Sequence, residues 1–256
     1  MQDVSPGVAL VTGAARRIGR AIASDLAAHG WPIAVHYHTS EGAARDLAAE
    51  IEGRGGRAVA LRADLRDEEA TAAVVATAAA ALGPITCLIN NASVFEDDKP
   101  DSVTRESWDL HMQVNLRAPL ILTQAVHRQL PEDQPGNVVN ILDQRVLNLT
   151  PHFTSYTVSK AALWALTQTL AMALAPRIRV NAVGPGPTLP SSRQTDEQFS
   201  RQWSMLPLKR QVMPREICDA VRFILDAPSM TGQMIAVDGG QHLGWGHRAT
   251  AVPLEE

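Results

Sequence analysis

The chain has 256 residues, of which 45% are hydrophobic, enough to form the core of one large α/β domain or of two small ones. Its formal net charge is −4 at pH 7, and Lys and Arg are scattered along the sequence rather than clustered. This distribution excludes the basic surface typical of proteins that bind nucleic acid or anionic membranes, so we expect a small-molecule partner.

The two cysteines, Cys87 and Cys218, lie in apolar surroundings and have no metal-ligand spacing, so we expect both in the core of a protein from a reducing compartment. The N-terminus lacks the basic region of a secretion signal, and the longest apolar stretch, residues 72–82, is far shorter than a membrane span. We therefore expect a cytoplasmic protein that does not contact a membrane.

Short β-rich runs alternate along the chain with longer stretches of helical period. Helices are expected from Ile18, from Glu41, from Asp67, at about 105–130 and from Tyr156 to Leu174. Strands are expected at 7–12, 32–38, 57–64, 85–90, 136–142, 178–183 and 233–240. This alternation predicts an α/β fold in which about seven parallel strands form one doubly wound sheet with helices on both faces.

No Gly-, Ser- or Pro-rich linker divides the sequence, so residues 1–256 are interpreted as a single domain. The stretch 188–216, hereafter the insertion, is polar and punctuated by proline, and it is expected to be irregular. An insertion beyond the carboxyl end of a strand in such a sheet usually covers a ligand. The alternative is a plain surface connection.

The loop TGAARRIG follows the first expected strand and opens the first helix, where backbone N–H groups and the helix dipole favour a phosphate. Gly13 and Gly19 lie six residues apart. Arginine stands where such loops most often have a middle glycine, which leaves Arg16 and Arg17 in the cradle. Arg17 can supply a permanent positive charge, whereas Arg16 has no assigned role.

The second expected strand ends in HYHTS, residues 36–40, where a fold that prefers NAD usually carries an acidic residue for the ribose. The absence of a carboxylate favours NADP(H), because His38 and Ser40 can donate hydrogen bonds to a 2′-phosphate. His36 and His38 have a spacing that a metal could use, but no third ligand is evident, so no metal is expected.

Tyr156 and Lys160 in YTVSK are four residues apart, so on a helix they project from one face. An ammonium group beside a phenol stabilises the phenolate, which makes Tyr156 a usable proton donor in a reduction.

The combination of TGAARRIG, NNA at 90–92, Asn115, YTVSK and GPG at 184–186 resembles the short-chain dehydrogenase/reductase superfamily over about residues 7–246. The resemblance implies a Rossmann-type fold, a nicotinamide cofactor and a homotetramer built on the two long helices. It also implies Tyr156 as acid, Lys160 on the nicotinamide ribose, a proton relay through Asn115 and an adenine contact from Asp64.

The expected cofactor contacts, taken from the loop patterns and from this resemblance, share the carboxyl edge of the sheet. They are Gly13, Arg17, Ile18, Gly19, His36, Tyr37, His38, Thr39, Ser40, Asp64, Leu65, Asn91, Ala92, Ser93, Tyr156, Lys160, Pro185 and Gly186.

One departure from the superfamily narrows the chemistry. Most members have a serine about thirteen residues before the tyrosine, but this sequence has Asp143 there. An ionised carboxylate has no proton to donate to a carbonyl and repels a developing alkoxide, so ketone reduction is a poor fit. Asp143 suits a substrate with N–H donors, as in reduction of a cyclic C=N bond. The alternative is a substitution in an unrelated loop.

The motifs TGAARRIG, HYHTS, NNASVF and YTVSK, together with Asp143, resemble the pteridine reductase branch, which includes the dihydromonapterin reductases. This resemblance implies that Arg17 reaches both the cofactor phosphates and the substrate, that Ser93 hydrogen-bonds nearby, and that Phe95 stacks on the pterin. The expected substrate contacts are Arg17, Ser93, Phe95, Asp143 and Tyr156. Close relatives often carry arginine at the position of Thr39, so we expect weaker recognition of the 2′-phosphate than the family pattern implies.

The leading hypothesis is an NADPH-dependent reductase of a dihydropterin such as dihydromonapterin, dihydrobiopterin or dihydrofolate. One alternative is a reductase of another small carbonyl or imine, and another is a non-catalytic NADP(H)-sensing protein. Trp245, in the C-terminal segment, is a candidate for capping a neighbouring subunit's cavity.

Overall fold

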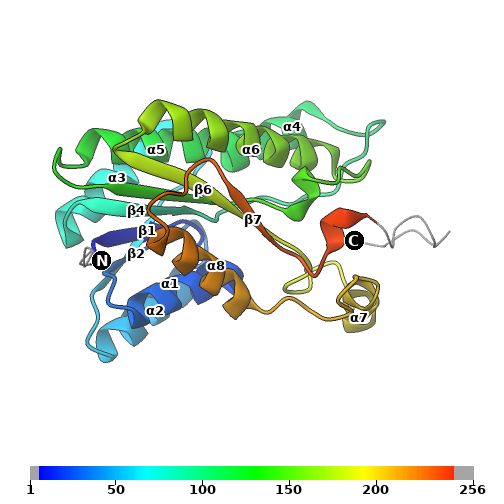
Figure 1. The fold of residues 1–256 in the computed structure, drawn as a ribbon, viewed down its shortest axis with the longest axis horizontal. Helices are drawn as coiled ribbons and strands as arrows, with labels where there is room; N and C mark the ends of the chain where they lie inside the picture. The colour runs from blue at the N-terminus through cyan, green and yellow to red at the C-terminus, as the bar shows by residue number, and fades with distance from the viewer. Residues whose placement is uncertain (1–5, 245–256) are drawn as a thin grey trace.

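The computed structural model describes residues 6–244, which form a seven-stranded parallel sheet with helices on both faces (Figure 1). The strand order is β3-β2-β1-β4-β5-β6-β7. The strands are β1 Val8–Val11, β2 Ile33–Tyr37, β3 Ala58–Arg62, β4 Ile85–Asn90, β5 Gly136–Ile141, β6 Ile178–Pro185 and β7 Met234–Val237. The predicted doubly wound α/β sheet is confirmed.

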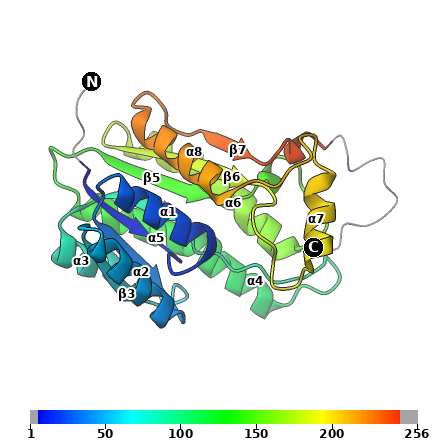
Figure 2. The same cartoon turned by 90° about the horizontal axis from the view of Figure 1, so that it is seen from below.

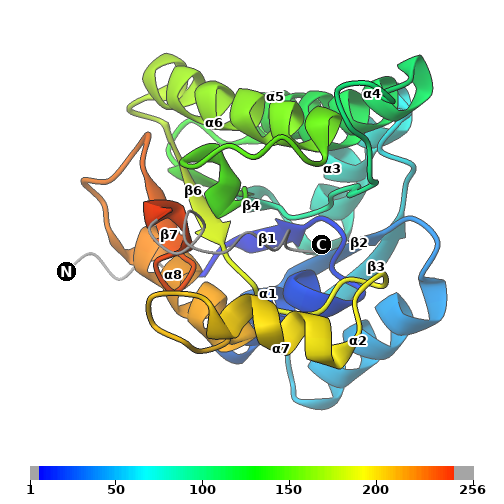
Figure 3. The ribbon, with the colours of Figure 1, turned by 90° about the vertical axis from the view of Figure 1, so that its right-hand side faces the viewer.

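Two layers of helices bury the two faces of the sheet, which is why the central strands read as continuous apolar runs (Figure 3). One layer contains α1 Arg17–Ala28, α2 Glu41–Gly53 and α8 Pro214–Asp226. The other contains α3 Glu68–Leu82, α4 Arg105–Met112, α5 Ala118–Gln129 and α6 Thr154–Leu174. A separate hydrophobic core lies beneath each layer, and Cys87 and Cys218 are buried as expected.

The helix expected at about 105–130 is present, but a π-helical turn, η1 Gln113–Arg117, separates α4 from α5. Asn115 lies in this turn. π-helical turns are rare in proteins, but those that occur are often found at functional sites. The wider turn changes which side chains face a neighbouring element. Periodicity alone did not predict this interruption.

The expectation that the insertion is irregular was wrong, because it contains helix α7 Asp196–Ser204 and its last residues begin α8. A capping box explains α7: Thr195 accepts from the Gln198 backbone N–H, while the Gln198 side chain accepts from the Thr195 N–H. Figure 2 shows α7 beside the carboxyl ends of the strands, where the prediction placed a ligand cover.

The strand order reverses between β1 and β4, so the chain leaves these neighbouring strands toward opposite faces. The crevice opened at such a switch point is where doubly wound sheets bind ligands. Within residues 6–244, no helix is long and apolar enough to cross a membrane.

Candidate active site

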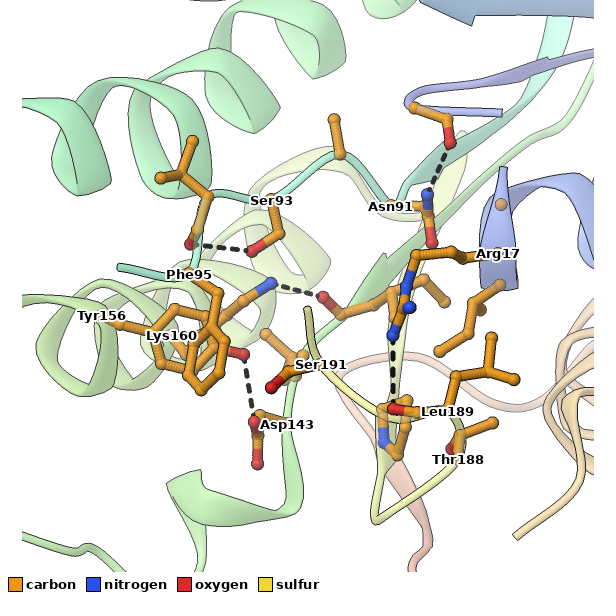
Figure 4. Close-up of a pocket in the computed structure, with 18 of the residues that line it drawn as sticks. Arg17, Asn91, Ser93, Phe95, Asp143, Tyr156, Lys160, Thr188, Leu189 and Ser191 are labelled. Atoms are coloured by element: carbon orange, nitrogen blue, oxygen red, sulfur yellow. Dashed lines mark hydrogen bonds between the residues drawn. The ribbon is translucent and has the colours of Figure 1, made fainter. Parts of the chain in front are cut away.

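A cavity of about 650 Å³ occupies the crevice above the carboxyl ends of the strands (Figure 4). It brings together most of the residues expected from the sequence: Gly13, Arg17, Ile18, Gly19, His36, His38, Asp64, Leu65, Asn91, Ala92, Ser93, Phe95, Asp143, Tyr156, Lys160, Pro185 and Gly186. The insertion also contributes to its wall, through Thr188, Leu189, Ser191, Gln194, Phe199 and Gln202.

Four of the predicted residues lie outside this lining. Tyr37 is buried in the core on the α1 and α2 face. Thr39 and Ser40 follow β2 on the surface side, and Ser40 occupies the N-cap position of α2 without a side-chain capping bond. Asn115 is fully buried behind the cavity wall.

In the loop between β1 and α1, residues 12–19 and hereafter the phosphate loop, only glycine fits at positions 13 and 19. Gly13 has φ +61°, and a Cβ at Gly19 would lie 2.4 Å from the Gly13 carbonyl oxygen. The Thr12 hydroxyl accepts from the N–H groups of Asn91 and Ala92, both at 2.9 Å. This contact ties the loop after β4 to the phosphate loop, and the closely packed backbone forms a cradle that any side chain would fill.

Arg17 occupies a backbone conformation that normally favours glycine, with φ +56°. A non-glycine residue in this left-handed region costs roughly 1–3 kcal/mol. Its guanidinium donates to the carbonyl oxygen of Leu189 at 3.2 Å (Figure 4) and to that of Pro190 at 2.9 Å. Arg17 therefore links the phosphate loop to the insertion across the mouth of the cavity.

His36, at the end of β2, is buried and forms a hydrogen bond with the phosphate loop. Its Nδ1 accepts from the Gly13 N–H at 3.1 Å, which leaves the proton on Nε2, 3.3 Å from the Ala63 carbonyl oxygen. Burial lowers the pKa of His36 to about 4, so the ring is neutral near pH 7. Both ring nitrogens are engaged by the backbone, and among the described residues no group of three potential ligands could hold a metal ion.

Arg66, which the sequence patterns did not single out, lines the cavity beside His38 and Asp64. Its guanidinium makes three hydrogen bonds to the Asp64 carboxylate, and His38 Nε2 lies 3.6 Å from the same group. The hydrogen bond from Arg66 lowers the pKa of Asp64 to about 2. The sequence offered one sign that Arg66 lies at the cofactor site: it directly follows Asp64 and Leu65, which were both predicted to contact the cofactor.

The expected catalytic pair lies on α6, with both polar heads at the cavity. The Tyr156 hydroxyl donates to Asp143 Oδ2 at 3.0 Å, and Lys160 Nζ donates to the Ile141 carbonyl oxygen at 2.9 Å. Burial lowers the pKa of Lys160 to about 8, and the Asp143 charge opposes this effect. Asp143 Oδ1 also accepts from the Arg145 backbone N–H, so the carboxylate is fixed at the start of a short 3₁₀ turn.

Asn115 uses its amide to hold the loop that follows β4. Its Oδ1 accepts from the Val94 N–H at 2.8 Å and from the Ser93 hydroxyl at 3.2 Å, while Nδ2 donates to the Val94 carbonyl oxygen and to Ser159 Oγ. The amide thereby joins the π-turn, this loop and α6.

Phe95 and Tyr156 line one side of the cavity, and the buried ring of Phe153 packs against Phe95; these three rings are called the aromatic wall. The Phe95 ring is stacked on Phe153 with centroids 4.3 Å apart and meets Tyr156 edge-on at 4.6 Å. Two arginines that sequence reasoning missed lie over this wall. Arg145 and Arg193 place their guanidinium carbons 5.9 Å and 5.1 Å from the Phe95 centroid, and Arg193 also donates to the Phe95 carbonyl oxygen.

A doubly wound sheet with a glycine cradle and a paired tyrosine and lysine at its switch point defines a class of nicotinamide-dependent oxidoreductases. The sequence model of the family described as Enoyl-(Acyl carrier protein) reductase matches residues 13–242, and the chain belongs to this family of the short-chain dehydrogenase/reductase superfamily. The superfamily resemblance expected from the sequence is thereby confirmed, and the similar structures crystallised with NADP confirm the nicotinamide cofactor.

Several characterised relatives and solved structures are similar over nearly the whole chain. FolM alternative dihydrofolate reductase 1 from Brucella canis, crystallised with NADP, superposes with a TM-score of 0.92 at 50% identity, covering 98% of this chain and 97% of that one. A short chain dehydrogenase from Burkholderia cenocepacia J2315, in complex with NADP, superposes with a TM-score of 0.86 at 34% identity. The match covers 91% of this chain and 97% of that one. A 3-oxoacyl-[acyl-carrier-protein] reductase from Synechocystis is 32% identical in sequence over 94% of this chain and 98% of the relative.

Proposed function

We propose that this protein is an NADPH-dependent reductase of a pterin-type substrate, reducing a dihydropterin to its tetrahydro form. The observation that carries the proposal is Asp143, which accepts from Tyr156 where most of the superfamily has a hydroxyl donor. A carboxylate at this point favours a substrate that presents N–H groups rather than a bare carbonyl oxygen. The 50% identity to the Brucella dihydrofolate reductase supports the same substrate class.

The phosphate cradle fits a dinucleotide, because Gly13 and Gly19 leave space that a Cβ would fill. Gly13, Ile18 and Gly19 would hold the pyrophosphate, while Asp64 and Leu65 would hold the adenine. NADPH, once bound, supplies the hydride for the reduction. His38, Arg17 and Arg66 provide the donors that a 2′-phosphate requires, and NADP or NADPH is present in the similar structures.

The chain's own residues provide orientation and the proton. Tyr156 donates its hydroxyl proton to the nitrogen of the C=N bond as the adjacent carbon is reduced. Lys160, held by the Ile141 carbonyl, supplies positive charge that stabilises the resulting phenolate. Asn115 positions the loop that carries Ser93, and it bonds α6 at Ser159. The proton relay through Asn115 that the family resemblance implies stays a prediction.

The aromatic wall is suited to a flat heteroaromatic ring. Phe95 would provide a stacking face, because offset contact between π systems adds to the gain from area burial. Arg17 and Ser93 face the same cavity and would contact polar edges of the pterin. The insertion, anchored by Arg17 and Arg193, would exclude water from the bound substrate.

A second candidate function is reduction of a 3-oxoacyl thioester, as the names of the Synechocystis and Staphylococcus epidermidis relatives state for those proteins. A panel of dihydromonapterin, dihydrobiopterin, dihydrofolate, 3-oxoacyl thioesters and simple ketones, followed by the loss of NADPH absorbance, separates the two. We expect turnover of at least one dihydropterin. Turnover confined to oxoacyl or ketone substrates would overturn the pterin proposal.

The sensor alternative makes a different prediction for Tyr156→Phe. If the protein is a non-catalytic sensor, both the unaltered protein and Tyr156→Phe bind NADPH and neither turns over substrate. If it is a reductase, the unaltered protein turns over substrate and Tyr156→Phe does not. The homotetramer and the cytoplasmic location remain predictions, and the suggested role of Trp245 lies outside the described residues.

A further inference from the structure

We propose that Asp98, His111 and Ser155 form a positioning network that fixes Phe95 and the start of the catalytic helix relative to one another. The three side chains come from different elements: the loop after β4, helix α4 and helix α6. All are buried, with exposed fractions of 5%, 0% and 0%. The inference concerns the reductase machinery as such and does not depend on the pterin substrate.

Asp98 caps α6 from a distant segment. Phe153, at the N-cap position, has φ +55° and makes no side-chain capping bond. The Thr154 N–H instead donates to the Asp98 carbonyl oxygen at 3.1 Å, and the Ser155 N–H donates to Asp98 Oδ1 at 3.0 Å. A carboxylate at this end also complements the helix dipole. The first turn of the helix that carries Tyr156 is therefore held by a loop 57 residues away in sequence.

The hydrogen bonds fix the tautomer of His111. Its Nε2 accepts from the Glu96 N–H at 3.1 Å, so the ring proton is on Nδ1. Nδ1 lies 2.7 Å from Ser155 Oγ and 2.8 Å from the Ser107 carbonyl oxygen. Nδ1 shares its single hydrogen between these two acceptors, and the Ser155 hydroxyl donates to Asp98 Oδ2, so hydrogen bonds connect His111 through Ser155 to Asp98.

The charges around the network agree with this assignment. Burial lowers the pKa of His111, and Lys160 acts in the same direction, while Asp98 and Glu96 oppose it. For Asp98, burial raises the pKa, but hydrogen bonds from Ser155 and Ser107 outweigh it and leave the pKa below its ordinary value. His111 is thus neutral and Asp98 is ionised near pH 7.

Helix α4 and the π-turn that follows it hold the loop on both sides of Phe95. Asn115 binds both backbone groups of Val94, and His111, four residues earlier and on the same helical face, binds the N–H of Glu96. Phe95 lies between the two fixed residues. His111 also lies edge-on to the Tyr156 ring, with centroids 6.1 Å apart. The network therefore sets the spacing between the aromatic wall and the proton donor.

The trio has the composition of a hydrolytic triad but not its function. Ser155 Oγ is fully buried, and its hydrogen is directed to Asp98 rather than to the imidazole. The imidazole donates toward Ser155 and cannot accept its proton. The geometry is that of a structural relay between three elements.

The test compares Ser155→Ala, Asp98→Asn and His111→Leu with His111→Gln, whose amide oxygen can still accept from the Glu96 N–H. We expect the first three to lower kcat roughly tenfold or more, because small misplacements of reacting groups are costly. The dissociation constant for NADPH, titrated by fluorescence without substrate, should change less than about twofold, since Arg17, Asp64 and the glycine cradle are untouched. His111→Gln should recover a large part of kcat relative to His111→Leu.

Thr123→Ala is the matched control, because Thr123 is also a buried hydroxyl but, within residues 6–244, bonds only the Pro119 carbonyl oxygen of its own helix. It should lower the melting temperature without changing kcat. Kinetics are measured with whichever substrate of the panel supports NADPH oxidation, so a failed pterin proposal leaves this test intact. The inference is overturned if the three variants fold and keep a normal kcat. It is also overturned if their affinity for NADPH falls by as much as their kcat. If Asp98→Asn does not fold, Ser155→Ala and the His111 pair decide.

Discussion

The hydroxyl of Tyr156 donates a 3.0 Å hydrogen bond to Oδ2 of Asp143, thirteen residues earlier in the chain. The proton that the reaction needs is therefore held by a carboxylate before substrate enters. Asp143 is in turn fixed by the Arg145 N–H, and the Arg145 Nε lies 3.9 Å from the same Oδ2. A substrate N–H group can replace the tyrosine as the donor to Asp143, which frees the hydroxyl to face the reacting bond.

Asp143→Ser tests this relationship. We expect the pterin turnover number to fall about 100-fold, a loss typical of removing one electrostatic contact to a reacting group, while the NADPH dissociation constant stays nearly unchanged. Asp143→Asn is the control of equal shape, since it keeps an acceptor oxygen for Tyr156, and it should lose less. Equal losses of turnover and of cofactor affinity would place Asp143 in cofactor binding or folding instead.

Arg17→Gly separates backbone strain from side-chain function. Glycine relieves the cost of φ +56°, so we expect Arg17→Gly to be about 1 kcal/mol more stable to urea than Arg17→Gln. Both variants lose the bonds to Leu189 and Pro190, and both should bind NADPH more weakly. A glycine variant no more stable than the glutamine variant would contradict the strain argument.

Arg66→Gln tests the assignment of the 2′-phosphate site. Removing a charged donor next to His38 should weaken NADPH binding about tenfold, equal to about 1.4 kcal/mol, and leave NADH binding nearly unchanged. Titration with 2′,5′-ADP and with 5′-AMP gives the same comparison without turnover. Arg62→Gln, at the end of β3, is the control, because Arg62 is exposed and does not line the cavity. Equal weakening of both nucleotides would show that Arg66 acts through Asp64 on the adenine.

The sequence predicted the sheet and the catalytic helix because their signals are local. Apolar runs identify buried strands, and the spacing of Tyr156 and Lys160 places both on one helical face. Contacts between distant segments were not predictable in this way. The cap that Asp98 supplies to α6, and the stacking of Phe95 on Phe153, depend on tertiary packing. Helix α7 was missed although its Thr195–Gln198 capping box is visible in the sequence.

The buried imidazole of His36 predicts a loss of stability in acid. Its pKa is about 4 in the folded protein and 6.5 in the unfolded chain, so between these values the unfolded chain binds more protons. The free energy of unfolding should therefore be fully retained above about pH 6.5 and fall by about 3 kcal/mol as the pH approaches 4. Urea titrations across this range measure the slope. His36→Asn keeps an acceptor for the Gly13 N–H and should be less stable near neutrality, but its stability should depend less steeply on pH. Because His111 contributes equally to both proteins, identical slopes would show that His36 is not the titrating group.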